Sequence, residues 1–239
     1  MAVYAFETRV SYDDIDADLS LSVKGVLNML QEAAIIHADK IGYSMRNVHE
    51  TGVAWILVQW RVRLLSKAYW DQNVTVRTWP RTMERAKSER DFEIVSEDGN
   101  VVAIGESVWV LVSTTTGRIV RITPEIASAY DLTERRVFSD VFLEPDEEVG
   151  TEKYCGTVMK RDIDTNGHVN NRVYLEYACE ALPDDFDMAT VKEVYIHYRR
   201  QLLSGQRFRC CYKYIDCAHV INILCIDSDV KHCTVILKS

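Results

Sequence analysis

"DIDADLSLSVKGVLNMLQEAA" (residues 14–34) returns in altered form as "DIDTNGHVNNRVYLEYACEAL" (residues 162–182). Both copies begin Asp-Ile-Asp, and at the same offset (162 − 14 = 148) Leu27 and Glu32 fall on another leucine and another glutamate. Each copy is followed by a long stretch rich in apolar and aromatic residues. Similarity at a long, constant spacing indicates that the chain is built from two related units.

Each half is predicted to combine one long helix with several antiparallel strands. Apolar residues recur at helical spacing from Val23 to His37, which predicts a helix of about 18 residues. A second helix is expected near 170–182, stopped by Pro183, and a short helix begins at Thr123. The expected strands are 53–64, 73–79, 90–97 and 101–113, then 151–161, 191–202, 207–216, 219–227 and 230–238. This order of elements favours an α+β fold in each half.

A linker is predicted between the halves. Residues 131–150 have weak periodicity and several acidic side chains. We therefore expect an N-terminal unit over 1–130 and a C-terminal unit over 151–239. Pairing the two units side by side would also cover sheet edges that a single unit leaves open.

Composition limits the classes of function. The 239 residues carry a net charge of −8, which argues against general nucleic-acid binding. No apolar run reaches the roughly 18 to 20 residues that a membrane span needs, and the N-terminus lacks the pattern of a secretory signal. The seven cysteines show no C-x-x-C spacing, so free thiols are expected instead of a zinc site. These features predict a cytoplasmic protein.

The stretch "RDIDTNGHVNNRVYLEY" begins like a calcium-binding loop. Asp162, Asp164, Asn166 and Gly167 match the start of D-x-[DN]-x-[DN]-G. The twelfth position of such a loop should supply a bidentate glutamate, and here it is Val173. The residues before the loop also alternate like a strand instead of forming a helix. We therefore expect no metal here.

Two interpretations of this loop remain open on the residues alone. As a turn, it would lead a strand into a helix capped by Asn170 or Asn171. As a catalytic centre, Asp164, Asn166 and His168 would converge on one side of the segment. A carboxylate and a histidine can activate water, and an asparagine amide can hold or polarise a substrate.

The first copy of the repeat bears on this choice. It keeps both aspartates but has Asp18 where the second copy has Asn166, and Ser20 where the second copy has His168. The copies therefore differ where chemistry would occur, which favours a catalytic second copy and a scaffolding first copy.

The loop, the segment "YRRQL" (198–202) and the tandem repeat together resemble acyl-ACP thioesterases of the bacterial and plant type. D-x-N-x-H-V-N-N before a helix is the specific part of the resemblance, which covers essentially the whole chain. It implies a double hot-dog fold, in which each long helix is wrapped by a curved antiparallel sheet. It also implies hydrolysis of the thioester between a fatty acyl chain and the phosphopantetheine arm of acyl carrier protein (ACP), in fatty acid biosynthesis. In this family the catalytic residues correspond to Asp164, Asn166 and His168, and the N-terminal unit shapes the acyl pocket without supplying catalysts.

One position departs from the plant pattern. After "YRR" the plant proteins carry a glutamate and then a cysteine, and here these positions are Gln201 and Leu202. Leu202 cannot be a nucleophile, which excludes covalent catalysis by a cysteine at this position. We therefore expect direct attack by water, activated by Asp164 and His168, with Gln201 positioning the reactants. Backbone N–H groups near the helix start are expected to stabilise the oxyanion, and no metal or cofactor is needed.

Binding residues can be suggested by position only. The stretch "RTWPRTMERAKSER" concentrates positive charge, either as a solvated surface or as a docking patch for an acidic partner such as ACP. The docking candidates are Arg81, Arg85, Lys87 and Arg90. Candidate walls of an acyl pocket are Trp60, Met29 and Leu30, each of which could equally be simple core.

Two other functions remain open. A hot-dog thioesterase acting on acyl-CoA would not need an acidic protein partner, and a non-catalytic acyl-binding module would need no Asp164, Asn166 and His168. The sequence also leaves open the acyl chain length, the choice between Asp164 and His168 as base, and whether the chain forms a homodimer.

Overall fold

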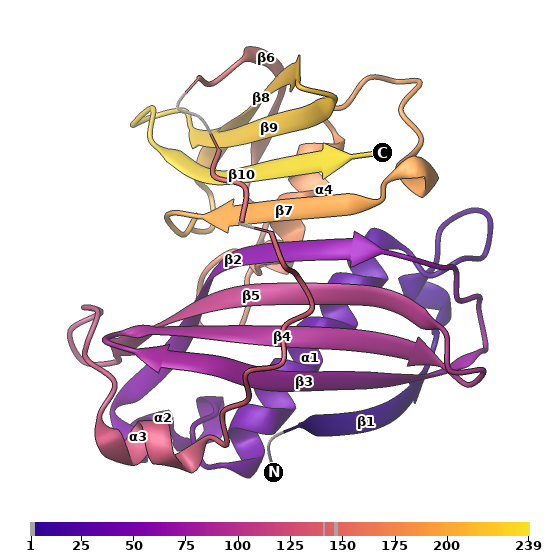
Figure 1. Ribbon diagram of the computed structural model, residues 1–239. Coiled ribbons are helices and arrows are strands. Elements are labelled where there is room, and N and C mark those ends of the chain that lie inside the picture. Colours follow the sequence, from indigo (N-terminus) through magenta and orange to yellow (C-terminus); the bar gives the residue numbers. More distant parts are fainter. Residues whose placement is uncertain (1–2, 141, 146–147) are drawn as a thin grey trace. The chain divides into compact units, whose positions relative to one another are not determined.

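The protein divides into two compact units, Met1–Val141 and Phe142–Ser239. A computed structural model describes residues 3–140, 142–145 and 148–239 (Figure 1). The boundary between the units falls inside the predicted linker 131–150. Because each unit has its own sheet and helix, each is described by itself.

The first unit is an antiparallel sheet with a long helix lying across it (Figure 1). The strand order is β1-β3-β4-β5-β2. The strands are β1 (Tyr4–Arg9), β2 (Val53–Leu64), β3 (Asn73–Glu84), β4 (Lys87–Ser96) and β5 (Val101–Ser113). The helices are α1 (Val23–Lys40), α2 (Val48–Thr51) and α3 (Pro124–Ala129). The long helix predicted from Val23 is confirmed at 18 residues.

The start of α1 is fixed by its cap and by a close approach to the first Asp-Ile-Asp loop. Ser22 is the N-cap, and its Oγ accepts a hydrogen bond from Gly25 N at 3.0 Å. A Cβ on Gly25 would lie 2.7 Å from Asp14 Cβ, so only glycine lets the helix pack this closely on the loop. The apolar stripe of α1 then faces the sheet, with Val26, Leu30 and Ala33 fully buried.

The second unit repeats this plan with a shorter helix. The strand order is β7-β10-β9-β8-β6, and neighbouring pairs are antiparallel. The strands are β6 (Thr151–Thr157), β7 (Glu193–Tyr198), β8 (Arg207–Ile215), β9 (Ala218–Cys225) and β10 (Lys231–Lys238). The helix α4 (Val173–Cys179) has 7 residues, fewer than the predicted 170–182, because turns occupy both of its flanks.

Several strand boundaries differ from prediction for identifiable reasons. β3 continues through Pro80, where a helix or strand break was expected, because the pairing with β1 extends only to Thr78 and the register shifts just beyond Pro80. A proline is tolerated there since no neighbouring strand needs its missing N–H. β6 ends at Thr157 and is followed by a 3₁₀ turn at Lys160–Asp162, and β1 was not predicted at all.

The predicted linker is bound to the sheets. In the first unit, Trp79 Nε1 donates to Arg135 O at 2.9 Å and Val137 N donates to Asp91 Oδ2 at 2.9 Å. In the second unit, Phe142 packs edge-on against Tyr195 at 5.6 Å between ring centroids. Tryptophan and asparagine donors that look like core residues in the sequence therefore hold the connecting segment in place.

The described residues show few features of other protein classes. No helix among them combines the length and hydropathy that crossing a membrane requires. No group of three or more His, Cys, Asp or Glu side chains among them is arranged to hold a metal ion. The seven cysteines are all free thiols, of which Cys155 and Cys217 are exposed.

The interior of the first unit contains a buried basic pair. His37 on α1 is 4% exposed, and its Nδ1 lies 2.9 Å from Nη1 of Arg90 on β4. Burial, reinforced by the charges of Arg90 and Lys40, lowers the pKa of His37 to about 4, although the exposed Asp131 opposes this. His37 is therefore neutral at pH 7, with Nδ1 accepting from the guanidinium.

This pair makes a prediction about acid stability. The folded pKa of His37 lies below the ordinary value of 6.5, so between pH 6.5 and pH 4 the unfolded chain binds a proton that the folded chain does not. Acidification from pH 7 to pH 4.5 should therefore lower the free energy of unfolding by about 2 to 3 kcal/mol through His37. Urea titrations at both pH values should show this loss shrinking by that amount in His37→Gln, while the exposed His49→Gln keeps it. Equal losses in the two variants would contradict the assignment.

Candidate active site

The second Asp-Ile-Asp loop is a tight turn closed at its base. An isolated bridge joins Ile163 to Val169, and Asp164 N donates to His168 O at 2.8 Å. At the tip, Gly167 N donates to Asp164 O at 3.1 Å, and Gly167 has a φ of +80°. Glycine adopts this left-handed conformation without steric cost. The turn therefore places the side chains of residues 164, 166 and 168 on one small loop.

The carboxylate of Asp164 organises this loop. Its Oδ1 accepts from Asn166 N at 2.8 Å and from His168 N at 3.4 Å. Its Oδ2 lies 3.5 Å from Asn166 Nδ2, which is the limit of a hydrogen bond. Asp164 is half-buried, so one oxygen is fixed by the backbone and the other can still accept a proton from water.

His168 presents an unsatisfied ring nitrogen. The residue is half-buried, and its Nδ1 is buried without a hydrogen-bond partner in the part of the chain that the structure describes. Buried polar atoms are almost always hydrogen-bonded, and exceptions need an explanation such as catalysis or a missing water. The imidazole is therefore free to exchange a proton with a bound substrate or water.

Gln201 lies next to the loop but not on a strand. β7 ends at Tyr198, so the alternation expected for a strand over 191–202 does not apply. Leu202 is nevertheless fully buried and Gln201 exposed, because Leu202 N donates to the Tyr174 hydroxyl at 2.9 Å and Leu202 O accepts from Val169 N at 3.0 Å. These bonds fix the segment carrying Gln201 against the base of the catalytic loop.

The sequence gave no signal for three residues that support the site. The Tyr174 hydroxyl on α4 holds Leu202, and His232 Nδ1 lies 3.2 Å from Arg200 O. Asp162 is 9% exposed and accepts from the Tyr177 hydroxyl at 2.6 Å, so it fastens the loop to α4. Only the buried position of their partners, which spacing does not show, distinguishes them from ordinary helix and strand residues.

The predicted oxyanion donors at the helix start are already engaged. Arg172 N donates to Asn170 Oδ1 at 3.2 Å, and Val173 N donates to Asn170 O at 2.9 Å. Asn170 therefore caps the turn before α4, as the turn interpretation expected. This leaves the Asn166 amide as the neutral donor on the loop.

The first copy has the same backbone. Ile15 bridges to Leu21, and Asp16 N donates to Ser20 O at 2.9 Å, each matching a bond of the second loop at an offset of 148 residues. Leu19 occupies the position of Gly167 and is left-handed as well, with a φ of +65°. The internal repeat read from the sequence is thus a structural repeat.

A second register links the segments beside the loops. Leu21 N donates to Ala68 O at 2.7 Å, as Val169 N does to Leu202 O. Tyr69 N donates to Gln72 Oε1 at 2.8 Å, and 134 residues later (203 − 69) Leu203 N donates to Gln206 Oε1 at 2.8 Å. At this offset Lys67 corresponds to Gln201.

The two loops differ in their charged groups. In the first copy, Lys67 Nζ lies 2.5 Å from Asp18 Oδ2, and Ser20 Oγ donates to Asp18 Oδ1 at 2.6 Å. The bond from Lys67 and those from Ser20 hold the pKa of Asp18 well below its usual range. In the second copy the three positions carry Asn166, Gln201 and His168. An ion pair is therefore replaced by two amides and an imidazole.

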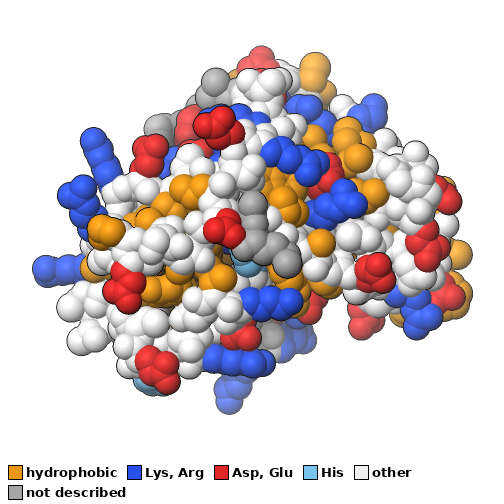
Figure 2. Space-filling view, turned by 60° about the horizontal axis from the view of Figure 1, so that its bottom comes forward, with side chains coloured by type: hydrophobic (Ala, Val, Ile, Leu, Met, Phe, Trp, Pro, Cys, Tyr) orange, Lys and Arg blue, Asp and Glu red, His pale blue; other side chains and the backbone are white. Residues whose placement is uncertain are grey.

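The predicted docking residues divide into two pairs. Arg85 and Lys87 are exposed at the β3–β4 turn, whereas Arg90 is 5% exposed and faces α1. The Arg81 side chain is 7% exposed and pairs with Asp91 at 2.8 Å. Arg81 and Arg90 therefore cannot contact a partner at the surface, because strand alternation and ion pairing turn them inward. On the face shown in Figure 2, basic side chains are interspersed with acidic ones.

The predicted pocket residues lie in the interior of the first unit. Trp60, Met29 and Leu30 are 1%, 4% and 0% exposed. The Trp60 ring lies 4.9 Å from the Phe92 ring, and a Cβ on Gly105 would lie 2.7 Å from Leu30 Cδ1. The three side chains face the space between α1 and the sheet, where they pack as core.

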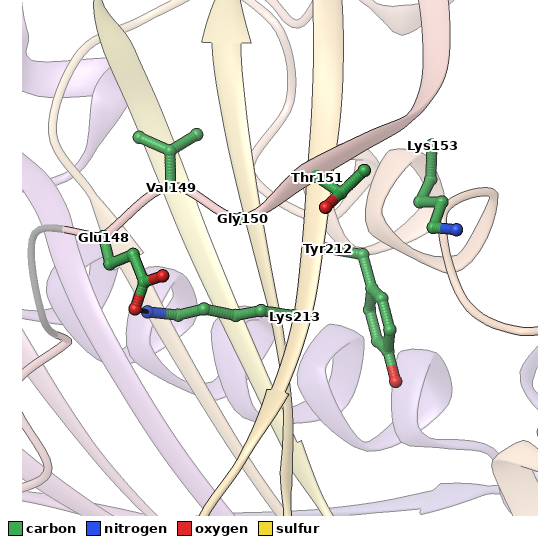
Figure 3. A pocket seen from close by; sticks show the side chains of 7 residues that line it. All are labelled: Glu148, Val149, Gly150, Thr151, Lys153, Tyr212 and Lys213. Atoms are coloured by element: carbon green, nitrogen blue, oxygen red, sulfur yellow. Dashed lines mark hydrogen bonds and ion pairs between the residues drawn. The ribbon is translucent and has the colours of Figure 1, made fainter.

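A separate pocket of about 680 Å³ lies in the second unit (Figure 3). It is lined by residues 148–151 together with Lys153, Tyr212 and Lys213. Lys213 Nζ points to Glu148 Oε2 across it, 3.4 Å away. None of the predicted site residues lines this pocket.

Comparison with known proteins places the chain in a family. Residues 2–130 match the acyl-ACP thioesterase N-terminal domain, and residues 144–232 match the C-terminal domain. The chain is 24% identical over 219 residues to oleoyl-acyl carrier protein thioesterase 2, chloroplastic, of Arabidopsis thaliana, covering 79% of this chain and 56% of that protein. A dodecanoyl-[acyl-carrier-protein] hydrolase of Cinnamomum camphora is 26% identical, with 79% and 53% covered. The chain spans about half the length of the curated relatives it matches.

Solved structures agree on the fold. An acyl-ACP thioesterase from Bacteroides thetaiotaomicron superimposes with a TM-score of 0.85 at 19% identity, covering 99% of this chain and 97% of that chain. The 12:0-ACP thioesterase from Umbellularia californica gives 0.82 at 20% identity, with 100% and 97% covered. The predicted α+β double hot-dog fold is confirmed. With both of its domains matched in order, the chain belongs to the acyl-ACP thioesterase family.

Proposed function

We propose that this protein hydrolyses fatty acyl-ACP to a free fatty acid and ACP, in fatty acid biosynthesis. The observation that carries the proposal is the loop of Asp164, Asn166 and His168, with one carboxylate oxygen fixed and one imidazole nitrogen unpaired. Membership of the acyl-ACP thioesterase family supports the choice of substrate. A cytoplasmic location is part of the proposal, and the seven free thiols support it.

The proposed reaction is a direct hydrolysis. Water attacks the thioester carbonyl carbon while Asp164, assisted by His168, accepts its proton. Asn166 donates to the carbonyl oxygen as negative charge develops on it. The tetrahedral intermediate then expels the thiolate of the phosphopantetheine arm, which takes up a proton, and the carboxylic acid departs. In this proposal Gln201 positions Asn166, and the first unit receives the acyl chain with Trp60, Met29 and Leu30 among its interior residues.

The same site could serve a different carrier. The inward-facing Arg81 and Arg90 leave Arg85 and Lys87 as the exposed members of the predicted docking set. A smaller basic surface favours acyl-CoA more than a full docking patch would, so an acyl-CoA thioesterase is the second candidate.

A carrier panel decides between the candidates. We expect kcat/KM to be higher for acyl-ACP than for acyl-CoA of the same chain length, with a steeper decrease in added salt because ACP is acidic. Arg85→Ala/Lys87→Ala should raise KM for acyl-ACP and leave acyl-CoA unchanged, whereas Arg118→Ala, an exposed change elsewhere, should affect neither. Equal loss on both carriers would indicate acyl-CoA, and no turnover across the panel would indicate a non-catalytic acyl-binding module.

A further inference from the structure

Arg90 is a buried cation without a carboxylate partner. Both of its hydrogen bonds come from Nη1, at 2.9 Å from His37 Nδ1 and 3.1 Å from Thr78 Oγ1. Throughout the described ranges it makes no ion pair. Arg61, also fully buried, instead pairs with Glu106 at 3.5 Å and with Asp140 at 2.5 Å. The two buried arginines of this unit are therefore in opposite situations.

The guanidinium of Arg90 retains binding capacity. Burying a charge without a counter-ion is costly, and burial accordingly lowers the pKa of Arg90 to about 10. Nε and Nη2 make no hydrogen bond within the described residues, and together they form the fork that binds a carboxylate in bidentate fashion. With His37 neutral, the pair carries one positive charge, which suits a monoanion.

Aromatic and apolar groups surround this cation. The Arg90 Cζ atom lies 5.9 Å from the Tyr130 ring, and the same ring contacts Tyr43 at 6.3 Å and Trp55 at 6.2 Å. Trp55 Nε1 is buried and has no acceptor among the described residues, so a second donor is unsatisfied nearby. The cluster around Tyr130 continues into half-buried Ile41 and other apolar side chains against α3.

We propose that the cluster of Arg90, His37, Thr78 and Tyr130, named here the Arg90 site, binds the carboxylate of a fatty acid. The alkyl chain lies against Tyr43, Trp55 and Ile41. Both the cation without a counter-ion and the apolar surface beside it are then satisfied by one amphipathic ligand. The same carboxylate can come from a free fatty acid or from the far end of an acyl chain that carries a second carboxyl group.

Calorimetric titration of the whole chain with dodecanoate, dodecanol and butyrate at pH 7.5 tests the Arg90 site. We expect dodecanoate to bind at least about tenfold more tightly than either, because the alcohol lacks the charge and butyrate lacks the tail. Arg90→Gln should remove the preference over dodecanol, and the exposed Arg85→Gln should keep it. Equal affinities for acid and alcohol, or an undiminished preference in Arg90→Gln, would overturn the proposal.

The native chain and a milder variant cover the case in which Arg90→Gln does not fold. Dodecanoate should change the tryptophan fluorescence of the native chain, and Trp55→Phe should lose most of that change. An unaltered signal in Trp55→Phe would place the acid elsewhere and overturn the proposal. Arg90→Lys, which keeps the charge without the fork, should retain an intermediate preference for the acid.

Hydrolysis assays distinguish the two sources of the carboxylate. Inhibition by dodecanoate that disappears in Arg90→Gln identifies the free acid, and faster turnover of terminally carboxylated acyl thioesters that disappears in Arg90→Gln identifies the substrate chain. The site itself is judged by the binding measurements, so it can hold or fail independently of the proposed hydrolase activity.

Discussion

Asp164→Asn should lower kcat for acyl-thioester hydrolysis by roughly 100-fold or more, the usual scale for loss of a general base. The substitution preserves the loop, because the asparagine oxygen can still accept from Asn166 N and His168 N, bonds that Asp164 Oδ1 makes at 2.8 and 3.4 Å. It removes the charge and the proton acceptor at Oδ2. We therefore expect KM and the unfolding midpoint to change little while kcat falls.

The repeat supplies a matched control for this variant. Asp16 occupies the equivalent place in the first loop, with the same bond from its N–H to residue 20. Asp16→Asn should leave kcat within about twofold, since the first copy takes no part in the proposed chemistry. A wild-type rate for Asp164→Asn would exclude Asp164 as the base. His168→Gln would then be expected to show the larger loss, because the imidazole would be the remaining group on the loop able to accept the proton.

The repeat made much of the fold predictable. Asp-Ile-Asp followed by helical spacing recurs at one offset, and both the closing bridges and the left-handed tips recur with it. α1 was predicted to its full length because 18 residues of amphipathic pattern outweigh local ambiguity. α4 was overestimated because its pattern at 170–182 includes turns, which share the same local spacing as a helix.

Side-chain direction was harder to predict than element type. "RTMERAKSER" reads as one basic surface, yet alternation along β4 sends Arg90 to the inner face of the sheet. Arg81 is held by Asp91, a partner from the neighbouring strand that becomes close only through pairing of β3 with β4. Burial and cross-strand ion pairing depend on tertiary structure, so no local pattern separates these arginines from the exposed Arg85 and Lys87.

The candidate catalytic residues were found because they interrupt a repeat, and the structure sharpens what that interruption means. Asn166, Gln201 and His168 correspond to Asp18, Lys67 and Ser20, three groups bonded to one another in the first copy. Gln201 could not be connected to the loop from sequence spacing, since the relevant bond joins Val169 to Leu202. The offset of 134 residues between these segments differs from the 148 of the loops, so the correspondence emerges only in three dimensions.

Asn166→Asp/Gln201→Lys should convert the second loop into the first and reduce kcat on the order of 100- to 1,000-fold, as expected for the loss of a preorganised donor to a developing oxyanion. The new pair should form the ion pair seen between Lys67 and Asp18 at 2.5 Å. The loss would be in kcat more than in KM, because the acyl chain is proposed to bind in the other unit. Steady-state kinetics with one acyl-ACP, together with thermal unfolding of the same samples, measure both effects.

Single and reciprocal variants separate the role of Gln201 from that of Asn166. Gln201→Lys alone keeps the Asn166 amide, so a positioning role predicts a loss well below that of the double variant and partial rescue by Gln201→Glu, which can still accept from the amide. Asp18→Asn/Lys67→Gln breaks the ion pair of the first copy and should leave kcat within about twofold, because Ser20 supplies no imidazole there. If the double variant in the second loop keeps kcat within tenfold of the native value, the asparagine is not the oxyanion donor. The Asp164 carboxylate and His168 would then have to carry the reaction without it, since the N–H groups of Arg172 and Val173 are already bonded to Asn170.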